Sequence, residues 1–318
     1  MESPAPTRYP LGKLPAQPAR PHLKLSAVLR ERLAAPPASC DWQADSISWP
    51  MYANDTVGCC TCAGVGHLVN QLTFYGTGTE ILPAESSVLG MYSAITGYNP
   101  KRPSSDTGAY CQDVLAYWRK TGLEGHKIVA YASLDVSNLT EVKQAIALFG
   151  SVYVGMTFPD SAMDQFNEGQ VWDVVRGARN DGGHCVIVGA YGNGKLGLVT
   201  WGAETEMTEA FWKKYVDEAW VVLDADGLNK AAAYFTGAPS FYALGEQFTA
   251  LTGEKNPIPA PSPQPTPTPT PEPTPLPAPT PSPVDPRLVQ AAVLTQQADS
   301  LMQAWAHDNN VTPPTNGA

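Results

Sequence analysis

The chain has 318 residues, and 43% of them are hydrophobic, which is enough to form a sizeable buried core. It carries 20 Lys and Arg residues against 30 Asp and Glu residues, a net charge of −10. Because binding to phosphates needs clustered cations, and none are clustered here, nucleic acid is not an expected partner. The sequence also lacks an apolar leader and any run of 18 apolar residues, so we expect no signal peptide, no membrane span and a cytoplasmic location.

In chain order, residues 1–38 are rich in Pro and Arg and predict an extended arm, with a short propeptide as the alternative interpretation. Residues 39–253 predict a globular domain that begins with helices. Apolar spacing and glycines just past two of the helix ends place these helices at Cys60 to Tyr75, Cys111 to Lys120 and Leu139 to Leu148.

The second half of this domain changes to β-rich runs. They start at Ser151, His184 and Leu196, and Gly192-Asn-Gly194 predicts a tight hairpin between the last two. A helical first half followed by a sheet-rich second half predicts an α+β fold with two lobes and a cleft between them.

Beyond the domain, residues 254–286 form a Pro-rich linker, since 15 of the 30 residues from Pro257 to Pro286 are proline. Residues 287–318 predict a C-terminal helix and tail, helical from Arg287 to His307. This helix is expected to bind a protein partner or another copy of the chain, and an exposed amphipathic tail is the alternative.

Six cysteines in a chain of this length are too few for a disulfide scaffold. Cys59, Cys60 and Cys62 lie close together, with His67 nearby, and thiols and imidazoles are typical metal ligands. Structural zinc sites usually space their thiols in pairs, and a second pair is missing. We therefore expect neither a metal nor a cofactor.

One of these thiols, Cys60, is a candidate nucleophile, and His184 follows it 124 positions later. A nearby imidazole converts a weakly reactive thiol into a nucleophilic thiolate. Cys60 also lies at a predicted helix start, where backbone amides favour a thiolate and donate to an oxyanion. Asn54 is placed to add a carboxamide donor, and Gly58 permits a tight turn before the thiol.

At this point the chain resembles the papain-like cysteine peptidases, of the stand-alone bacterial or phage type. Their motif has Gln six residues before the nucleophile and Gly two before it, where this chain has Asn54 and Gly58. Their mature domain begins at Pro-x-x-Val-Asp-Trp, which resembles Pro37-Ala-Ser-Cys-Asp41-Trp42. Asp41 lies 19 residues before Cys60, as the family spacing requires.

Further similarities follow in order along about residues 37–222. Asp106-Thr-Gly108 resembles the Asn-Gly-Gly segment that lines the main specificity pocket, so the resemblance implies substrate binding by Asp106 and Gly108. His184-Cys-Val-Ile-Val-Gly resembles the segment of the catalytic histidine. Trp201-Gly202 resembles the end of Asn-Ser-Trp-Gly, which adds Trp201 to the substrate-binding residues.

The third catalytic residue departs from the family pattern. Counting back from Trp201 puts Val199 at the position of the Asn that orients the imidazole, and valine accepts no hydrogen bond. Counting forward from His184 puts Thr200 there instead. A shift of one residue reverses the face of a strand on which a side chain lies, so the two alternatives differ in chemistry.

The resemblance implies a thiol-dependent hydrolase of peptide or amide bonds, with Cys60, His184, Asn54 and Thr200 as catalytic residues and a peptide or protein as substrate. The alternative function is a catalytically inactive papain-fold module with a binding or structural role, tethered through its Pro-rich linker and C-terminal helix. A virion-associated or released protein is the corresponding alternative location.

Overall fold

The computed structural model describes residues 7–26, 35–43 and 47–224, with isolated positions from 246 to 256. The chain divides into two compact units, 1–262 and 263–318, and all described residues belong to the first. The proline-rich run from Pro257 and the predicted C-terminal helix lie outside the described residues.

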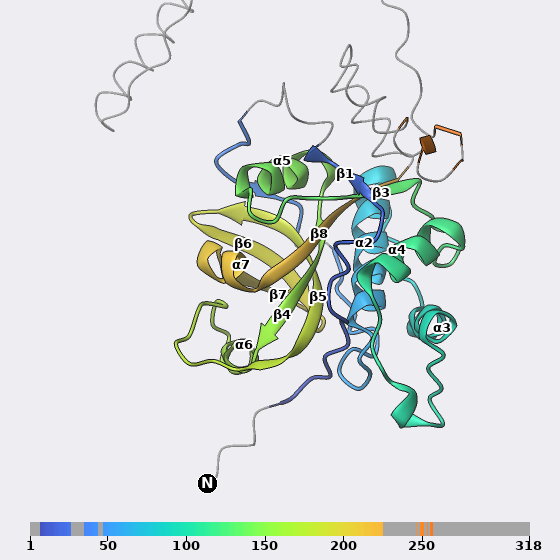
Figure 1. Cartoon of the computed structure of the whole chain (residues 1–318), viewed down its shortest axis with the longest axis horizontal. Coiled ribbons are helices and arrows are strands. Elements are labelled where there is room, and N and C mark those ends of the chain that lie inside the picture. Colours follow the sequence, from blue (N-terminus) through green and yellow to red (C-terminus); the bar gives the residue numbers. More distant parts are fainter. Residues whose placement is uncertain are drawn as a thin grey trace, which may run out of the picture. The chain divides into compact units, whose positions relative to one another are not determined.

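Three helices form one part of the fold, on one side of the molecule in Figure 1: α2 (Cys60–Thr77), α3 (Glu85–Thr96) and α4 (Cys111–Lys120). The first twelve residues of α2 are all buried, so this helix is surrounded by protein rather than facing water on one side. It ends at Gly78, whose left-handed φ of 75° suits a residue without a side chain. The α2 and α4 helices match the expected ranges within two residues, whereas α3 was not predicted from the sequence.

An eight-stranded sheet forms the other part, in the order β1-β3-β8-β4-β5-β6-β7, with β2 also paired to β5. All pairs are antiparallel except β1 with β3. The strands are β1 (Leu23–Lys24), β2 (Cys40–Asp41), β3 (Ala130–Ser133), β4 (Val152–Pro159), β5 (Asn180–Gly192), β6 (Lys195–Thr200), β7 (Ala203–Thr208) and β8 (Val216–Leu223). Since β1 belongs to the N-terminal arm, part of the arm is built into the sheet.

Three further helices belong to the sheet-rich part: α5 (Leu139–Phe149), α6 (Asp160–Asn167) and α7 (Glu209–Tyr215). The 3-10 turn η1 (Pro103–Ser105) precedes α4. Asn138 caps α5, because its side chain accepts a hydrogen bond from the amide of Glu141. The hairpin predicted at Gly192-Asn-Gly194 joins β5 to β6, and Asn193 and Gly194 both have positive φ.

Two hydrophobic cores meet at β5. One core includes Val186 and Val188, and the other includes Cys185 and Ile187 with Cys60 and much of α2. Alternate residues of a strand point to opposite faces, so β5 contributes to both cores. The strand that carries His184 therefore packs directly against the helix that begins with Cys60.

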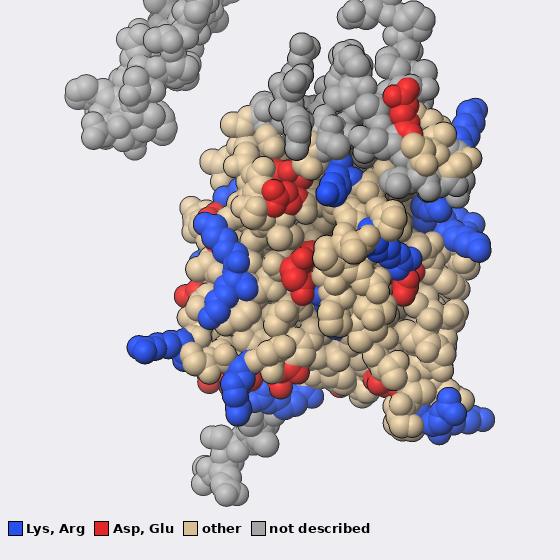
Figure 2. Space-filling model, in the orientation of Figure 1, with Lys and Arg blue, Asp and Glu red and all other residues tan. Residues whose placement is uncertain are grey.

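The surface carries no continuous cationic patch on the face shown in Figure 2, where Lys and Arg side chains are scattered among acidic and neutral ones. Among the described residues, no helix is long and apolar enough to cross a membrane.

Candidate active site

Cys60 is the first residue of α2, and its side chain is fully buried. A compact turn leads into the helix, in which the amide of Val57 donates to the carbonyl of Ala53. Tyr52 and Ala53 both have left-handed φ values, 53° and 58°, which side-chain-bearing residues seldom adopt. Such local strain is often found where a loop must hold a functional group.

Asp106 braces this turn. Its Oδ2 accepts a hydrogen bond of 2.8 Å from the amide of Gly58, and its Oδ1 accepts one of 2.6 Å from the Tyr92 hydroxyl. Tyr92 in turn accepts a hydrogen bond from the amide of Gly108. The carboxylate predicted to bind substrate is thus engaged within the protein, where it fixes the backbone two residues before Cys60.

Asn54 is buried in the same turn, and its Oδ1 accepts no hydrogen bond from the residues that the structure describes. Its amide donates to the carbonyl of Met51. The carboxamide therefore belongs to the loop that precedes the thiol, as its spacing predicts, but among the described residues its oxygen makes no hydrogen bond to another site residue.

His184 is held by Thr200. The Nε2 atom of His184 lies 2.7 Å from Oγ1 of Thr200, and both side chains are buried. Ile187 of β5 pairs with Val199 of β6, and paired residues share a face of the sheet. Val199 consequently lies on the Ile187 face, and Thr200 lies on the His184 face. The register shift at Gly189 produces this alignment.

Aromatic rings enclose the imidazole. Trp201 stacks on His184 with ring centroids 4.3 Å apart and an interplanar angle of 16°, and Phe158 packs edge-on at 5.3 Å. Trp201 and Gly202 form the two-residue turn between β6 and β7, both with positive φ. The turn thus places the tryptophan directly after the threonine that holds the histidine.

Among the described residues, neither ring nitrogen of His184 is hydrogen-bonded to the Cys60 thiol, since Nε2 contacts Thr200 and Nδ1 has no partner, and neither group is charged in this state. Burial raises the pKa of the Cys60 thiol to about 12, although amides of Gly12, Cys185 and Thr61 oppose the shift, and burial lowers the pKa of His184 to about 3. The Nδ1 atom of His184 has no hydrogen-bond partner in the described part of the chain. The site therefore contains a neutral thiol and a neutral imidazole with one free nitrogen.

The N-terminal arm contributes to the burial of Cys60, because Gly12 lies against the thiol and the arm runs between the two parts of the fold (Figure 1). The amide of Ala109 donates to the carbonyl of Gly12 at 2.8 Å, and the amide of Lys13 donates to the carbonyl of Gly183 at 2.9 Å. Gly12 packs so closely that an added Cβ would lie 1.6 Å from the carbonyl oxygen of Gly58. The arm thus covers the thiol with a residue that has no side chain.

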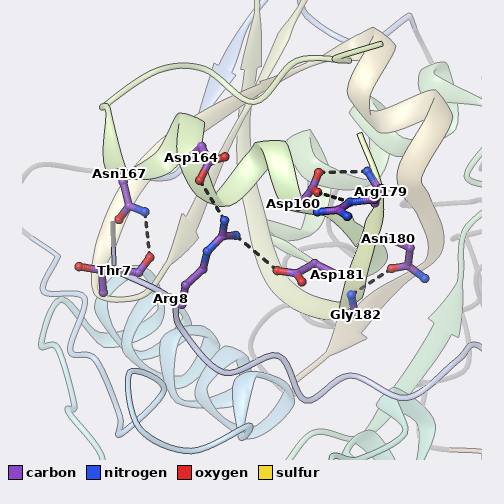
Figure 3. Close-up of polar contacts among 9 residues, drawn as sticks. All are labelled: Thr7, Arg8, Asp160, Asp164, Asn167, Arg179, Asn180, Asp181 and Gly182. Carbon is purple, nitrogen blue, oxygen red and sulfur yellow. Dashed lines mark hydrogen bonds and ion pairs between the residues drawn. The ribbon is translucent and has the colours of Figure 1, made fainter. Parts of the chain in front are cut away.

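Further contacts anchor the start of the arm (Figure 3). Arg8 lies 3.3 Å from a carboxylate oxygen of Asp164 and 3.5 Å from one of Asp181, and Asn167 donates to the carbonyl of Thr7. Tyr9 stacks on Trp201 with centroids 4.9 Å apart. The arm residues from Thr7 to Leu14 therefore contact α6, β5, the β6–β7 turn and the segment before α4.

These arm contacts were missed by sequence reasoning, which predicted an extended arm but not where it lies. An extended segment has no periodicity from which to infer its partner. The usable signals were Gly12, a glycine outside any predicted turn, and Lys13, the next residue.

Within residues 7–224, apart from the two short gaps, no three His, Cys, Asp or Glu side chains are grouped to hold a metal ion. Cys111 and Cys185 approach to 4.0 Å between sulfurs, and all cysteines are free.

The fold is similar to those of solved cysteine proteases. Xylellain, a cysteine protease from Xylella fastidiosa, shares 13% identity with a TM-score of 0.54, covering 71% of this chain and 100% of that one. Procathepsin B S9 from Trypanosoma congolense shares 10% identity with a TM-score of 0.51, covering 67% of this chain and 86% of that one. No protein-family model and no curated protein sequence matches the chain.

The molecule therefore has the fold of the papain-like cysteine proteases. This likeness confirms the α+β class and the family resemblance inferred from the sequence. At 13% and 10% identity this likeness defines the fold alone, and any activity depends on the side chains of the candidate site.

Proposed function

We propose that the protein is a thiol-dependent hydrolase of peptide or amide bonds. Its N-terminal arm lies in the cleft and holds the enzyme in a latent state. The observation that carries the proposal is the hydrogen bond between Nε2 of His184 and Oγ1 of Thr200. It anchors Nε2 and leaves Nδ1 free, so one nitrogen orients the ring and the other is available to exchange a proton.

In the proposed reaction, Cys60 passes its proton to Nδ1 of His184 while its sulfur attacks the carbonyl carbon of the substrate. The helix-start amides, with Asn54, donate to the resulting oxyanion. Collapse of this intermediate breaks the carbon–nitrogen bond, and His184 returns the proton to the leaving amine. Water then hydrolyses the thioester, which restores the thiol and releases the carboxylic acid.

The arm must leave before this reaction begins. Cys60 has no solvent exposure, and the amide of Gly12 faces the sulfur, which lowers the pKa of the thiol slightly against the larger effect of burial. Removal of the arm admits both water and substrate, which favours the charged pair.

The test uses the full chain with Gly12→Ala, because the added methyl group cannot fit against Gly58. We expect a peptidyl electrophile to label this variant on Cys60, and expect Cys60→Ala or His184→Ala in the same background to abolish the labelling. Equal labelling with and without Cys60 would contradict the assignment. Exposure of Cys60 to iodoacetamide without labelling by the peptidyl reagent would favour the inactive binding module.

A further inference from the structure

We infer that the cleft selects a lysine or arginine side chain on the acyl side of the bond that it cuts, through an acidic pocket formed by Asp217 and Glu218. This inference rests on the proposed function and adds the substrate class. The pocket is visible because Lys13 of the arm fills it.

Lys13 is a buried cation with two carboxylates. Its side chain is 1% exposed, and its Nζ lies 2.5 Å from Oδ1 of Asp217 and 3.2 Å from Oε1 of Glu218. Glu218 is itself 8% exposed. Burial favours the neutral amine, but the hydrogen bond to Asp217 and the two negative charges outweigh it, so the pKa of Lys13 is raised. The pocket is therefore built for a positive charge.

The shape of the pocket depends on Gly155 of β4. An added Cβ there would lie 2.7 Å from Cε of Lys13 and 2.7 Å from Cγ of Glu218. Any larger residue would close the space that the aliphatic part of the lysine occupies. Glu218 is also held in place, since its Oε2 accepts a hydrogen bond from Nε1 of Trp220. The Glu218 carboxylate is thus held in place beside Gly155 and the aliphatic part of Lys13.

The position of the arm indicates which side of the bond this pocket serves. Gly12 lies at the thiol, and Tyr9 and Lys13 lie on opposite sides of it along an extended chain. Tyr9 stacks on Trp201, which covers His184, and His184 is the proton donor to the leaving amine in the proposed reaction. Lys13 therefore occupies the acyl side.

Departure of the arm leaves Asp217 and Glu218 without their cation. Glu218 is buried and would keep only its hydrogen bond from Trp220, while the side chain of Asp217 is 32% exposed. An incoming lysine or arginine restores the cation beside these two negative charges, so it is preferred to a neutral side chain. A cavity of about 340 Å³ adjoins the pocket, and its lining combines Asp135 and the same two carboxylates with His22, Lys24 and the arm segment from Ala16 to Pro18.

The test uses the full chain with Gly12→Ala and compares how fast two peptidyl electrophiles label it. One reagent has lysine at the two residues before the reactive group and the other has norleucine there, and they are otherwise identical. Norleucine keeps the length of the side chain and removes the charge. We expect labelling of Cys60 to be at least about 10-fold faster with lysine. The added changes Asp217→Asn and Glu218→Gln should abolish that preference. Lys13→Asp, which expels the arm by charge repulsion, provides a second open variant.

Equal labelling by the two reagents would overturn the inference and leave the proposed function intact. Absence of labelling by both reagents would overturn the proposed function. In that case a binding assay tests whether the pocket still prefers a cationic side chain. In that assay a fluorescent peptide with the sequence of residues 7–16 is added to the Gly12→Ala chain, with lysine or norleucine at position 13. Tighter binding of the lysine peptide, lost on neutralising Asp217 and Glu218, would support a cation pocket; equal binding would overturn it.

Discussion

Thr200 Oγ1 lies 2.7 Å from Nε2 of His184, a contact made possible because the two side chains share one face of neighbouring strands. A hydroxyl can both donate and accept, so it holds the imidazole in either protonation state. In the proposed reaction Thr200 is therefore a positioning residue, because it would act on the substrate only through the ring that it orients.

Replacing Thr200 with valine removes the hydroxyl while keeping the shape of the side chain. In the Gly12→Ala background we expect Thr200→Val to slow hydrolysis, or labelling of Cys60 by a peptidyl electrophile, by about 10- to 100-fold. The measurement is the rate as a function of pH, because a loosened imidazole also shifts the apparent pKa of the pair.

The matched control is Thr200→Ser, which keeps the hydroxyl and should recover most of the rate. A Thr200→Val rate and pH profile equal to those of the parent would show that the hydrogen bond does not orient the ring.

Gly12→Ala tests whether the arm keeps the thiol inaccessible. Its Cβ would meet the backbone of Gly58, which cannot rotate away as a side chain can. We expect iodoacetamide to modify Cys60 at least about 10-fold faster in this variant, because a buried thiol reacts only from an open state. Peptide mapping by mass spectrometry identifies the modified cysteine.

Gly90→Ala serves as the control, since a Cβ at Gly90 in α3 meets no atom within 4 Å. That variant should leave the modification rate of Cys60 unchanged. If Gly12→Ala behaves like Gly90→Ala, the arm does not limit access to the thiol.

Asp106 should affect the reaction of Cys60 through the preceding turn, because it accepts a hydrogen bond from the amide of Gly58. Asp106→Ala leaves the Gly58 amide and the Tyr92 hydroxyl without their acceptor, a loss of roughly 1–3 kcal/mol for a buried group. We expect slower labelling of Cys60 in the Gly12→Ala background, with Asp106→Asn intermediate because its single carbonyl oxygen still accepts. Asp55→Ala, an exposed residue of the same turn, should have no effect. A rate for Asp106→Ala equal to that for Asp55→Ala would exclude a positioning role.

Much of the fold could be predicted because its elements carry local signals. The helix at Cys111–Lys120 has an apolar face and ends before Gly122, and the β5–β6 hairpin has Asn193 and Gly194 in the turn. The choice between Val199 and Thr200 could not be made from the sequence, since it depends on the register shift at Gly189. That shift results from pairing between strands, which a count along the chain does not contain.

The acidic pocket was beyond sequence reasoning for a related reason. Lys13, Gly155 and Glu218 lie far apart in the chain, and each alone is an ordinary residue. Only the packing of the arm against β4 and β8 brings them together. The charge of Lys13 and its position in an extended arm do not indicate which carboxylates will form ion pairs with it.

His67 should make stability fall at acid pH. It is buried in α2, and Nε2 contacts the carbonyl oxygen of Pro50 at 2.7 Å. Burial lowers its pKa to about 4 from the ordinary value of 6.5, although the contact with Pro50 opposes the shift. The unfolded chain therefore binds a proton between pH 6.5 and 4 that the folded chain does not, so its contribution to stability is complete above pH 6.5 and is lost as the pH falls towards 4.

The slope is about 1.4 kcal/mol per pH unit for one histidine, or roughly 3 kcal/mol across this window. Urea unfolding at pH 7.5 and pH 5 measures the difference, and His67→Gln, which can still donate to Pro50, should make it smaller. His126→Gln, at a half-buried position, is the control and should leave the difference as it is in the parent chain. His184 adds a similar dependence, because burial lowers its pKa to about 3 as well. An unchanged difference in His67→Gln would mean that the imidazole of His67 is already protonated, or exposed, in the folded protein.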